Sequence, residues 1–374
     1  MTTLLLTGFP ASFLARRMLT KVLASEAETQ VVCLTPRAQL QAAETELGKL
    51  ASGQRRRVEV AVGDTGDMDF GISGKRFLEL AQRVDLVHHC AFATYAGVRR
   101  QIAERANIAG TGEVLELCEA SERGCRLVLW STCSASGKRQ GRVGEGELVS
   151  PASFSTPVEE TRFRAEQMVR QAMERVPTTI LRPSTIVGDS RTGEIDRMEG
   201  PYLLILLMLS SPVDLRVPLP GRGDVPLNLV PIDYVVDAGY AISKDPRSVG
   251  RTFHIVDENP PSARRVFELI AEAAGRPGPV GSLPSQLATA LLRTPGLERI
   301  SHIPRTFLEQ LATEVIYDAR NTHEVLSATG IECPKAVSYL PVMVDYVRKQ
   351  QQKRSAAKQR EPRRPEETEE DPLG

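Results

Sequence analysis

The sequence has few features of a disulfide-linked, metal-binding or membrane-spanning protein. Its six cysteines form no CxxC pair, and several lie in apolar strand-like runs, so we expect reduced core thiols and no metal site. His88 and His89 are adjacent, so on a strand they would point to opposite faces. The longest apolar run, Leu203–Leu209, is far shorter than the roughly 20 residues of a membrane span. It predicts a buried helix or part of an apolar substrate lining.

The sequence also lacks an excess of charge of either sign. Lys plus Arg and Asp plus Glu each number 47, so no overall field favours nucleic acid or an anionic membrane. The first ten residues, MTTLLLTGFP, contain no basic region and no long apolar region, which argues against a signal peptide. We therefore expect a cytoplasmic-type protein with no nucleic-acid partner and no transmembrane segment.

Short apolar runs alternate with amphipathic stretches in the first half of the chain. This alternation predicts a doubly wound parallel sheet with helices on both faces, an α/β fold. A further strand–helix–strand passage runs from Leu227 through Ile242 to Phe253–Val256. The expected strands are Leu4–Leu6, Val31–Leu34, Val58–Val62, Leu86–His89, Leu127–Trp130 and Thr179–Leu181, and the expected helices lie around Leu14–Leu23, Leu40–Leu50, Arg76–Gln82, Ile108–Glu119 and Glu159–Arg175.

The composition changes after Pro183. Residues 189–225 are rich in Gly, Pro and Asp, and residues 260–350 are typical of helices and loops. We predict a core over residues 1–257, with 189–225 contributing to a substrate lobe, and a smaller, mostly helical C-terminal substrate lobe over 258–350. Residues 351–374 are first basic and then acidic, which predicts a disordered tail.

The first expected strand ends in a turn of small residues. A phosphate-binding turn needs such residues because backbone N–H groups must approach a pyrophosphate at a helix N-terminus. Only Gly8 is a glycine. Ala11 or Ser12, and then Ala15, stand where further glycines are expected, and the turn is one residue longer than usual. With the strand–helix alternation, the turn predicts a Rossmann-type core that binds a dinucleotide.

The end of the second expected strand carries Arg37, one βαβ unit after Gly8. An acidic residue there would bind the ribose 2′-hydroxyl of NAD, whereas an arginine suits the 2′-phosphate of NADP(H). The alternative is a solvated surface arginine. Asp64, after the third strand, is predicted to bond the adenine edge, and Ala91–Ala93, after the fourth, to pass under the nucleotide.

Several short motifs occur here in the order found in extended short-chain dehydrogenases/reductases. They are Gly63-Asp64, His89-Cys90-Ala91, Asn107-Ile108-Ala109-Gly110-Thr111, Ser131-Thr132 and Leu181-Arg182-Pro183-Ser184. The passages 186–193 and 230–235 are typical of the branch that contains thioester-reductase and fatty acyl-CoA reductase domains, the male-sterility-type NAD-binding branch. The chain resembles this branch over roughly residues 1–350, and the joint order of the motifs is more specific than any one of them.

The resemblance implies a carbonyl reductase that uses NADP(H). It also implies a small-molecule or acyl-thioester ligand, with residues near Leu203–Leu209 as a candidate acyl tunnel, and it leaves a homodimer or another protein partner open. The cofactor-binding residues that it implies, together with the turn, are Gly8, Pro10, Ala11, Ser12, Phe13, Leu14, Arg37, Asp64, Thr65, Ala91, Phe92, Ala93, Asn107, Arg162, Pro183 and Thr185.

The catalytic positions depart from the family pattern. In that pattern a Ser or Thr after the fifth strand bonds the substrate oxygen, a Tyr donates the proton, and a Lys four residues later holds the ribose. The resemblance places Thr132 in the first role, with a backbone-capping hydroxyl as the alternative. Thr156-Pro157-Val158-Glu159 is a capping box with Pro at the first helical position, so a helix is expected from about residue 157. The pattern then sets Val158 on the Tyr and Arg162 on the Lys.

Having VxxxR in place of YxxxK has a direct chemical meaning. Valine cannot protonate an alkoxide, and arginine can bond the ribose but cannot relay protons at neutral pH. Losing a general acid costs about 10²–10⁴ in rate. We therefore expect a nucleotide-binding protein with impaired or absent turnover. The alternative is an active NADPH-dependent reductase of an acyl-CoA, another thioester or a related carbonyl that uses a non-standard acid. Tyr95 and Tyr202 are the candidate substitutes, although a packing or surface role is favoured for each.

Overall fold

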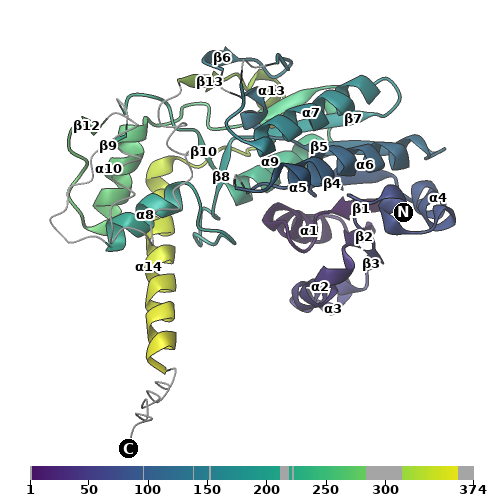
Figure 1. Ribbon diagram of the computed structural model, residues 1–374, viewed down its shortest axis with the longest axis horizontal. Coiled ribbons are helices and arrows are strands. Elements are labelled where there is room, and N and C mark those ends of the chain that lie inside the picture. The colour runs from purple at the N-terminus through teal and green to yellow at the C-terminus, as the bar shows by residue number, and fades with distance from the viewer. Residues whose placement is uncertain are drawn as a thin grey trace, which may run out of the picture.

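The computed structural model describes residues 2–95, 97–137, 139–150, 153–210, 219–220, 223–283 and 314–360. Seven parallel strands form its central sheet in the order β11-β7-β5-β4-β1-β2-β3 (Figure 1). Their bounds are β1 Thr3–Thr7, β2 Gln30–Thr35, β3 Val58–Val62, β4 Leu86–His89, β5 Arg126–Trp130, β7 Thr178–Pro183 and β11 Thr252–Ile255. The predicted Rossmann-type parallel sheet is confirmed, and each expected strand matches one of these.

The sheet is covered by helices on both faces because successive strand residues point in opposite directions. On β1, Leu4 and Leu6 belong to one hydrophobic core and Leu5 to another. The first core is closed by α1 Phe13–Ser25, α2 Leu40–Leu47, α9 Ile232–Lys244 and α13 Arg320–Leu326. The second is closed by α4 Gly74–Arg83, α6 Gly110–Glu119 and α7 Pro157–Ala172.

A third core lies beside the sheet and forms a second lobe. It is built from α8 Pro201–Ser210, α10 Ala263–Ala274 and α14 Ala336–Arg360, with side chains from the neighbouring short strands. Figure 1 shows these three helices together on one side of the sheet, with α14 running away from the rest of the chain. The apolar run Leu203–Leu209 lies within α8 as a buried helix. No helix among the described residues is both long and apolar enough to cross a membrane.

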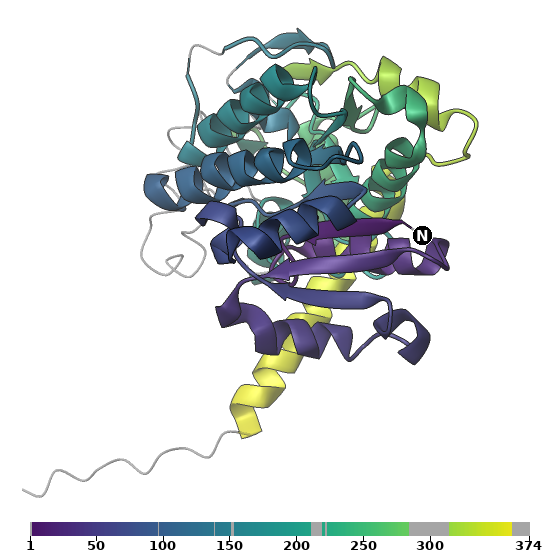
Figure 2. The same cartoon turned by 90° about the vertical axis from the view of Figure 1, so that its right-hand side faces the viewer.

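The C-terminal region is shared between the two lobes. Within residues 258–350, α10 and α14 belong to the second lobe, whereas Val325 and Leu326 of α13 pack in the first core of the sheet. Thus part of this region returns to the core that was expected to end at residue 257. Helix α14 also continues to Arg360, ten residues into the segment predicted to be disordered, because residues 348–360 are mostly good helix formers such as Ala, Gln, Lys and Arg. Figure 2 shows this end of the helix projecting beyond the sheet.

Shorter elements complete the fold around the ends of the strands. Parallel pairs are formed by β6 Gly141–Val143 with β13 Val315–Tyr317, by β8 Thr185–Val187 with β10 Leu229–Pro231, and by β9 Leu219–Pro220 with β12 Ser282–Leu283. Short helices occur at α3 Ser52–Arg55 and α5 Arg100–Ala103, and a π-helical turn at Glu104–Ala109 joins α5 to α6. The β8–β10 pair leads from the sheet into the second lobe.

Candidate functional site

A cavity of about 970 Å³ opens at the carboxyl ends of the central strands. Strand order reverses between β1 and β4, and ligands of open parallel sheets bind at such a switch point. Of the predicted site residues, the structure brings together around this cavity Gly8, Ala11, Ser12, Phe13, Leu14, Asp64, Thr65, Ala91, Phe92, Ala93, Thr132, Arg162, Pro183 and Thr185. Pro10, Arg37, Asn107 and Val158 are not among its lining residues.

The turn after β1 requires its glycine. Gly8 has a φ of +86°, and a Cβ on it would lie 2.7 Å from the carbonyl oxygen of Cys90. The Gly8 carbonyl accepts a hydrogen bond from Ser12 N at 2.8 Å, and Ser12 Oγ accepts one from Ala15 N at 3.3 Å, which caps α1. Pro10 is buried, and its peptide bond with Phe9 is cis. The turn therefore leaves the N-terminus of α1 beside the cavity, where an anion is favoured.

The loop after β4 is held in place by hydrogen bonds to the side chains of Thr7 and Asn107. Thr7 Oγ1 accepts hydrogen bonds from Cys90 N and Ala91 N, each at 3.1 Å. Asn107 is fully buried in the π-helical turn, and its Oδ1 accepts from Ala93 N at 2.8 Å. Asn107 therefore positions the backbone at Ala93 and does not line the cavity itself.

Two arginines are candidates for binding the adenosine end of a dinucleotide, where NADP(H) carries its 2′-phosphate. Arg37 is exposed in the turn that follows β2, where Pro36 and Gln39 line the cavity in its place. Arg105 does line it, and its Nη2 lies 2.7 Å from Asp67 and 3.2 Å from Asp64. Nothing in the local sequence singles out Arg105, because its place depends on how the π-helical turn packs. Recognition of a 2′-phosphate by Arg37 remains a prediction.

Thr132 and Arg162 line the same cavity at the end of β5. Thr132 Oγ1 accepts a hydrogen bond from Ser134 N at 3.2 Å, so this hydroxyl also caps the following turn. Arg162 is only 7% exposed. Its Nη2 donates to the carbonyl of Trp130 at 2.7 Å, and its guanidinium carbon lies 3.8 Å from the centre of the Phe92 ring. Burial lowers the pKa of Arg162 to about 10, so the side chain stays cationic at neutral pH.

One nitrogen of the Arg162 guanidinium, Nη1, has no hydrogen-bond partner. Nη1 is buried and unpaired among the described residues. A buried donor left unpaired costs roughly 1–3 kcal/mol, and more when it is charged. A ligand that brings a hydroxyl or carbonyl oxygen into this cavity would remove that cost. The residues present therefore fit a bound sugar hydroxyl, a substrate oxygen or both.

Helix α7 presents this arginine as the sequence predicted. The helix begins at Pro157, Thr156 Oγ1 accepts from Glu159 N at 3.2 Å, and a Glu159 carboxylate oxygen accepts from Ser155 N at 2.7 Å. The expected start of the helix is confirmed. Val158 lies one turn before Arg162 and is half-buried.

The next turn of α7 carries Glu166, which was not among the predicted site residues. Its carboxylate accepts from Ser131 Oγ at 2.7 Å and pairs with Arg182 at 2.6 Å. Burial raises the pKa of Glu166, but the charge and hydrogen bonds of Arg182, together with Arg170 and Ser131, outweigh burial, so the net shift of the pKa is downward. This buried ion pair ties α7 to the ends of β5 and β7 and so fixes the helix face that carries Arg162.

The two candidate substitute tyrosines have different surroundings. Tyr202 is fully buried, and its hydroxyl accepts from Gly188 N at 2.9 Å and donates to Gly193 O at 3.1 Å. It therefore has a packing role. Tyr95 is 48% exposed and is the only tyrosine among the described residues that line the cavity.

The end of the cavity nearest the second lobe is polar. Asp196, Arg197 and Glu199 line it, and burial raises the pKa of Glu199. Of α8, the described lining includes only Pro201, because the apolar side chains of this helix pack against α10 and α14. The candidate acyl tunnel at Leu203–Leu209 is therefore not part of this cavity.

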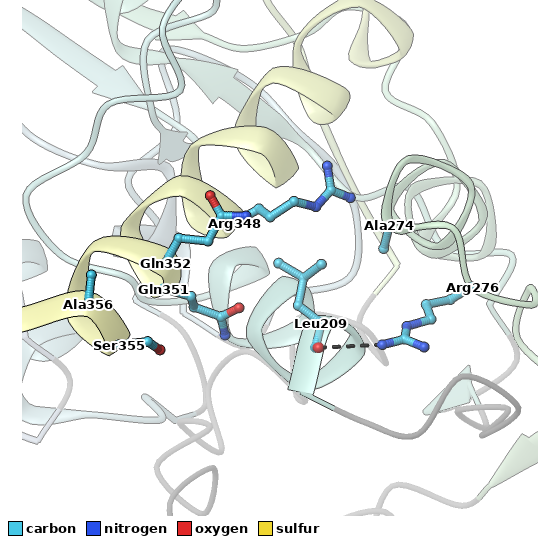
Figure 3. A pocket seen from close by; sticks show the side chains of 8 residues that line it. All are labelled: Leu209, Ala274, Arg276, Arg348, Gln351, Gln352, Ser355 and Ala356. Atoms are coloured by element: carbon cyan, nitrogen blue, oxygen red, sulfur yellow. Dashed lines mark hydrogen bonds between the residues drawn. The ribbon is translucent and has the colours of Figure 1, made fainter. Parts of the chain in front are cut away.

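A smaller hollow of about 580 Å³ lies between α8, α10 and α14 (Figure 3). Arg276 donates to the carbonyls of Met208 at 3.1 Å and Leu209 at 3.5 Å, and Arg348 donates to the carbonyl of Ala273 at 3.0 Å. These arginines satisfy carbonyls at helix C-termini, which have no partner within the helix. Leu209, the last residue of the candidate acyl segment, lines this hollow, but none of the predicted catalytic or cofactor-binding residues does. Among the described residues, no group of three His, Cys, Asp or Glu side chains could hold a metal ion.

Comparison with known proteins yields one family and several partial relatives. The sequence model of the NAD-binding male sterility protein family matches residues 6–239. Glycine betaine reductase ATRR of Emericella nidulans is 29% identical over 233 residues, which cover 60% of this chain and 18% of that protein. Fatty acyl-CoA reductase wat of Drosophila melanogaster is 27% identical over 219 residues, covering 51% of this chain and 42% of that protein.

The similar solved structures agree on the fold. The terminal R domain from the myxalamid PKS-NRPS biosynthetic pathway has a TM-score of 0.77 and 24% identity, and the match covers 94% of this chain and 91% of that domain. By contrast, the chain spans less than a third of the length of the first curated relatives that it matches (18%, 4% and 27%).

Proposed function

This chain belongs to the male sterility protein family of NAD-binding domains. From that membership we propose that it binds NADP(H) and reduces the carbonyl group of an acyl thioester. We expect this reduction to be slower than in a site that has a Tyr and a Lys at the positions of Val158 and Arg162. The observation that carries the proposal is the cavity at the strand ends, where the glycine turn, Thr132 and Arg162 meet. Relatives that are named as reductases of glycine betaine and of fatty acyl-CoA support this reaction class.

The nucleotide end of the cavity fits the proposal in size and chemistry. Sites for cofactors usually enclose about 300–1,000 Å³, and this cavity is at the upper end of that range. The Gly8 turn and the N-terminus of α1 would hold the pyrophosphate, and Asp64 and Thr65 the adenosine end. Arg37, at the edge of that end, would supply the charge that favours NADP(H).

The reactive end would be formed by Thr132 and Arg162. The bound nicotinamide would supply a hydride to the substrate carbon. Thr132 would donate a hydrogen bond to the substrate oxygen, and Arg162 would hold the nucleotide ribose or that oxygen through Nη1, which has no partner in the described part of the protein. Arg162 is buried and held in place before a ligand binds, and donors positioned in advance in this way stabilise developing charge most strongly.

A second candidate function rests on Val158. With no acidic group at this position, the chain would keep the nucleotide as a ligand and act as a sensor or a protein-binding module. Nucleotide affinity alone cannot separate the two candidates, because both need it. Turnover separates them.

Two measurements test the proposed function. Purified chain is titrated with NADPH and with NADH by fluorescence, and NADPH oxidation and thiol release are then followed with octanoyl-CoA and with an octanoyl thioester of 4′-phosphopantetheine. We expect NADPH to bind more tightly than NADH, and both thioesters to release thiol as NADPH is oxidised. Tight binding without thiol release from either thioester would support the second candidate and reject the reductase.

The coenzyme preference has its own test at Arg37. A hydrogen bond to a charged group contributes about 1.5–3 kcal/mol, so Arg37→Ala should weaken NADPH binding about 10- to 100-fold and leave NADH binding nearly unchanged. Arg56→Ala, at an exposed arginine outside the cavity, is the matched control. Equal losses for both nucleotides would reject the role of Arg37. A selective loss in Arg105→Ala would move that role to the arginine that lines the cavity.

A further inference from the structure

The end of the cavity nearest the second lobe holds a carboxylate without a bonded partner. Glu199 lines the cavity, and its side chain forms no hydrogen bond or ion pair with any residue that the structure describes. Asp196 and Arg197 line the same end, but both are exposed. Asp196 also pairs with Arg16 of α1 at 3.6 Å. Glu199 is only partly exposed, so it is the less solvated acid of this end.

The backbone holds Glu199 in place just before α8. Its N–H donates to the carbonyl of Arg197 at 3.0 Å, and its carbonyl accepts from Tyr202 N at 3.2 Å. Tyr202 is fully buried, and its hydroxyl bonds the backbone at Gly188 and Gly193. The segment between β8 and α8 is thus tied at both ends, and it presents Glu199 to the cavity from a fixed backbone.

The charged form of Glu199 is poorly compensated within the protein. Burial raises the pKa of its carboxyl, the Arg197 guanidinium opposes this shift and the Asp196 carboxylate adds to it, and the net shift of the pKa is upward. A carboxyl pKa above its usual value means that the folded chain stabilises the anion less well than water does. A ligand cation beside the carboxylate would supply the missing stabilisation, because a nearby opposite charge favours the charged form.

Another part of the same cavity carries the opposite charge. Arg162 is 7% exposed, and its Nη1 has no hydrogen-bond partner among the residues described. Arg162 and Glu199 both line this one cavity. A ligand that satisfies both groups places an oxygen at Arg162 and a positive group at Glu199, since complementary charges decide which ligand is accepted and in which orientation.

A saturated alkyl chain does not suit this end of the cavity. The apolar side chains of α8 pack against α10 and α14, and of this helix only Pro201 is in the described lining. A methyl end placed against Glu199 would displace water from the carboxylate without replacing its hydrogen bonds. Burying a charged group in this way is costly unless it is paired. The second-lobe end therefore disfavours an acyl group that ends in a methyl.

We propose that the Glu199 end of the cavity is a subsite for an ammonium group, so that the preferred acyl thioester carries a positive charge at the far end of its chain. The inference rests on the proposed reduction of acyl thioesters, and it adds the class of acyl group. The ammonium group takes no part in hydride transfer. Glu199 acts on specificity alone, by pairing with the end of the chain, while Thr132 and Arg162 act at the carbonyl.

Matched thioesters test the subsite on the full chain. Dimethylaminohexanoyl-CoA and dimethylaminooctanoyl-CoA, each with its amine at the far end, are cations at neutral pH. Each is compared with the neutral isostere in which C–H replaces N–H⁺, and kcat/KM is taken from NADPH oxidation coupled to thiol release. We expect the cation to be preferred about tenfold at one or both chain lengths, the lower end of a charge-assisted hydrogen bond, because Glu199 is only partly buried. Neutral isosteres reduced as efficiently at both lengths would overturn the inference and leave the proposed function standing.

A variant of the carboxylate assigns the preference to one residue. Glu199→Gln keeps the size of the side chain and removes its charge, so the preference should fall below about twofold, with the cationic thioester reduced more slowly and the neutral one faster. Glu194→Gln is the matched control, because Glu194 is an exposed acid of the same segment that does not line the cavity, and it should keep the preference. A preference that persists in Glu199→Gln would contradict the role of Glu199.

A binding measurement separates the subsite from the reaction. With NADP⁺ in place of NADPH no hydride is available, so calorimetry with the same thioesters reports binding alone. We expect the cationic thioester to bind about tenfold more tightly than its isostere, and Glu199→Gln to remove the difference. Equal affinities at both chain lengths would reject the subsite. Preferential binding of the cation without reduction of any thioester would reject the proposed reductase and leave the ammonium subsite standing.

Discussion

Arg162 has one nitrogen bonded to the protein and another without a partner among the described residues, whereas a lysine would have a single nitrogen for both contacts. Its Nη2 is bonded to the Trp130 carbonyl, its guanidinium carbon lies 3.8 Å from the centre of the Phe92 ring, and its Nη1 has no hydrogen-bond partner in the part of the chain that the structure describes. A lysine ammonium is a compact point charge on a flexible stem and cannot stack in this way. Compared with a lysine, an arginine here is a more rigid donor and cannot pass protons on at neutral pH.

At Gly8, the addition of a single methyl group should have a large effect on both stability and nucleotide binding. Its positive φ and its contact with the Cys90 carbonyl leave no room for a side chain. We expect Gly8→Ala to lower the free energy of unfolding by about 1–3 kcal/mol and to weaken NADPH binding at least tenfold, roughly 1.4 kcal/mol. Denaturant unfolding and a fluorescence titration measure the two effects.

A second glycine provides the control for this substitution. A Cβ on Gly53, in α3, would meet no atom within 4 Å. Gly53→Ala should leave NADPH affinity unchanged and stability equal or slightly higher, since alanine favours a helix. If Gly8→Ala bound NADPH as the native protein does, the turn would not be the pyrophosphate site.

At the scale of elements, α7 is the helix on which the proposed chemistry depends. Successive turns of one face carry Val158, Arg162 and Glu166, and the buried pair of Glu166 with Arg182 anchors that face to the sheet. The helical segment between α5 and α6 contributes to the site by holding its backbone in place. Its π-helical turn places Asn107 against the backbone at Ala93, and such turns often occur at functional sites.

The N-terminal cap of α7 gives a prediction at this scale. Thr156→Ala removes the acceptor for Glu159 N and should cost about 1 kcal/mol of unfolding free energy, measured by denaturant unfolding. Only the first turn, which carries Val158, should fray, so we expect NADPH affinity to change less than threefold. Thr156→Ser keeps the acceptor and should behave like the native protein. A loss of more than about 3 kcal/mol would exceed what a cap contributes.

For the whole molecule, three buried histidines make stability depend on pH. Burial lowers the pKa of His88 and His89 to about 3 and that of His254 to about 4. The unfolded chain, in which histidine has a pKa of about 6.5, binds protons that the folded chain excludes. The stability contributed by the neutral rings is therefore complete above about pH 6.5 and is lost as the pH falls.

The expected result is a melting temperature that decreases steadily between pH 6.5 and pH 4, measured by circular dichroism or calorimetry. His323 is exposed, so His323→Gln should leave this profile unchanged. A melting temperature that stayed constant down to pH 4 would mean that these histidines are not held neutral in the folded protein.

Much of the site could be predicted from sequence because it is built from local signals at the ends of strands. The glycine turn, the loop at Ala91–Ala93 and the capping box each depend on residues close together in the chain. Arg105 and Glu199 could not be predicted in this way. They reach the cavity from the π-helical turn and from the segment before α8, and their positions depend on packing between elements far apart in sequence.

The sequence by itself determined the parallel sheet, the course of its strands and helices, and the start of α7, because hydrophobic period and helix capping act over a few residues. Only the tertiary structure decided that Arg37 lies at the surface while Arg105 lines the cavity, that α13 returns to the sheet, and that one nitrogen of Arg162 is left open. These outcomes depend on which distant groups meet and which donors they satisfy. No local pattern carries that information, since the contacts form only when the whole chain has folded.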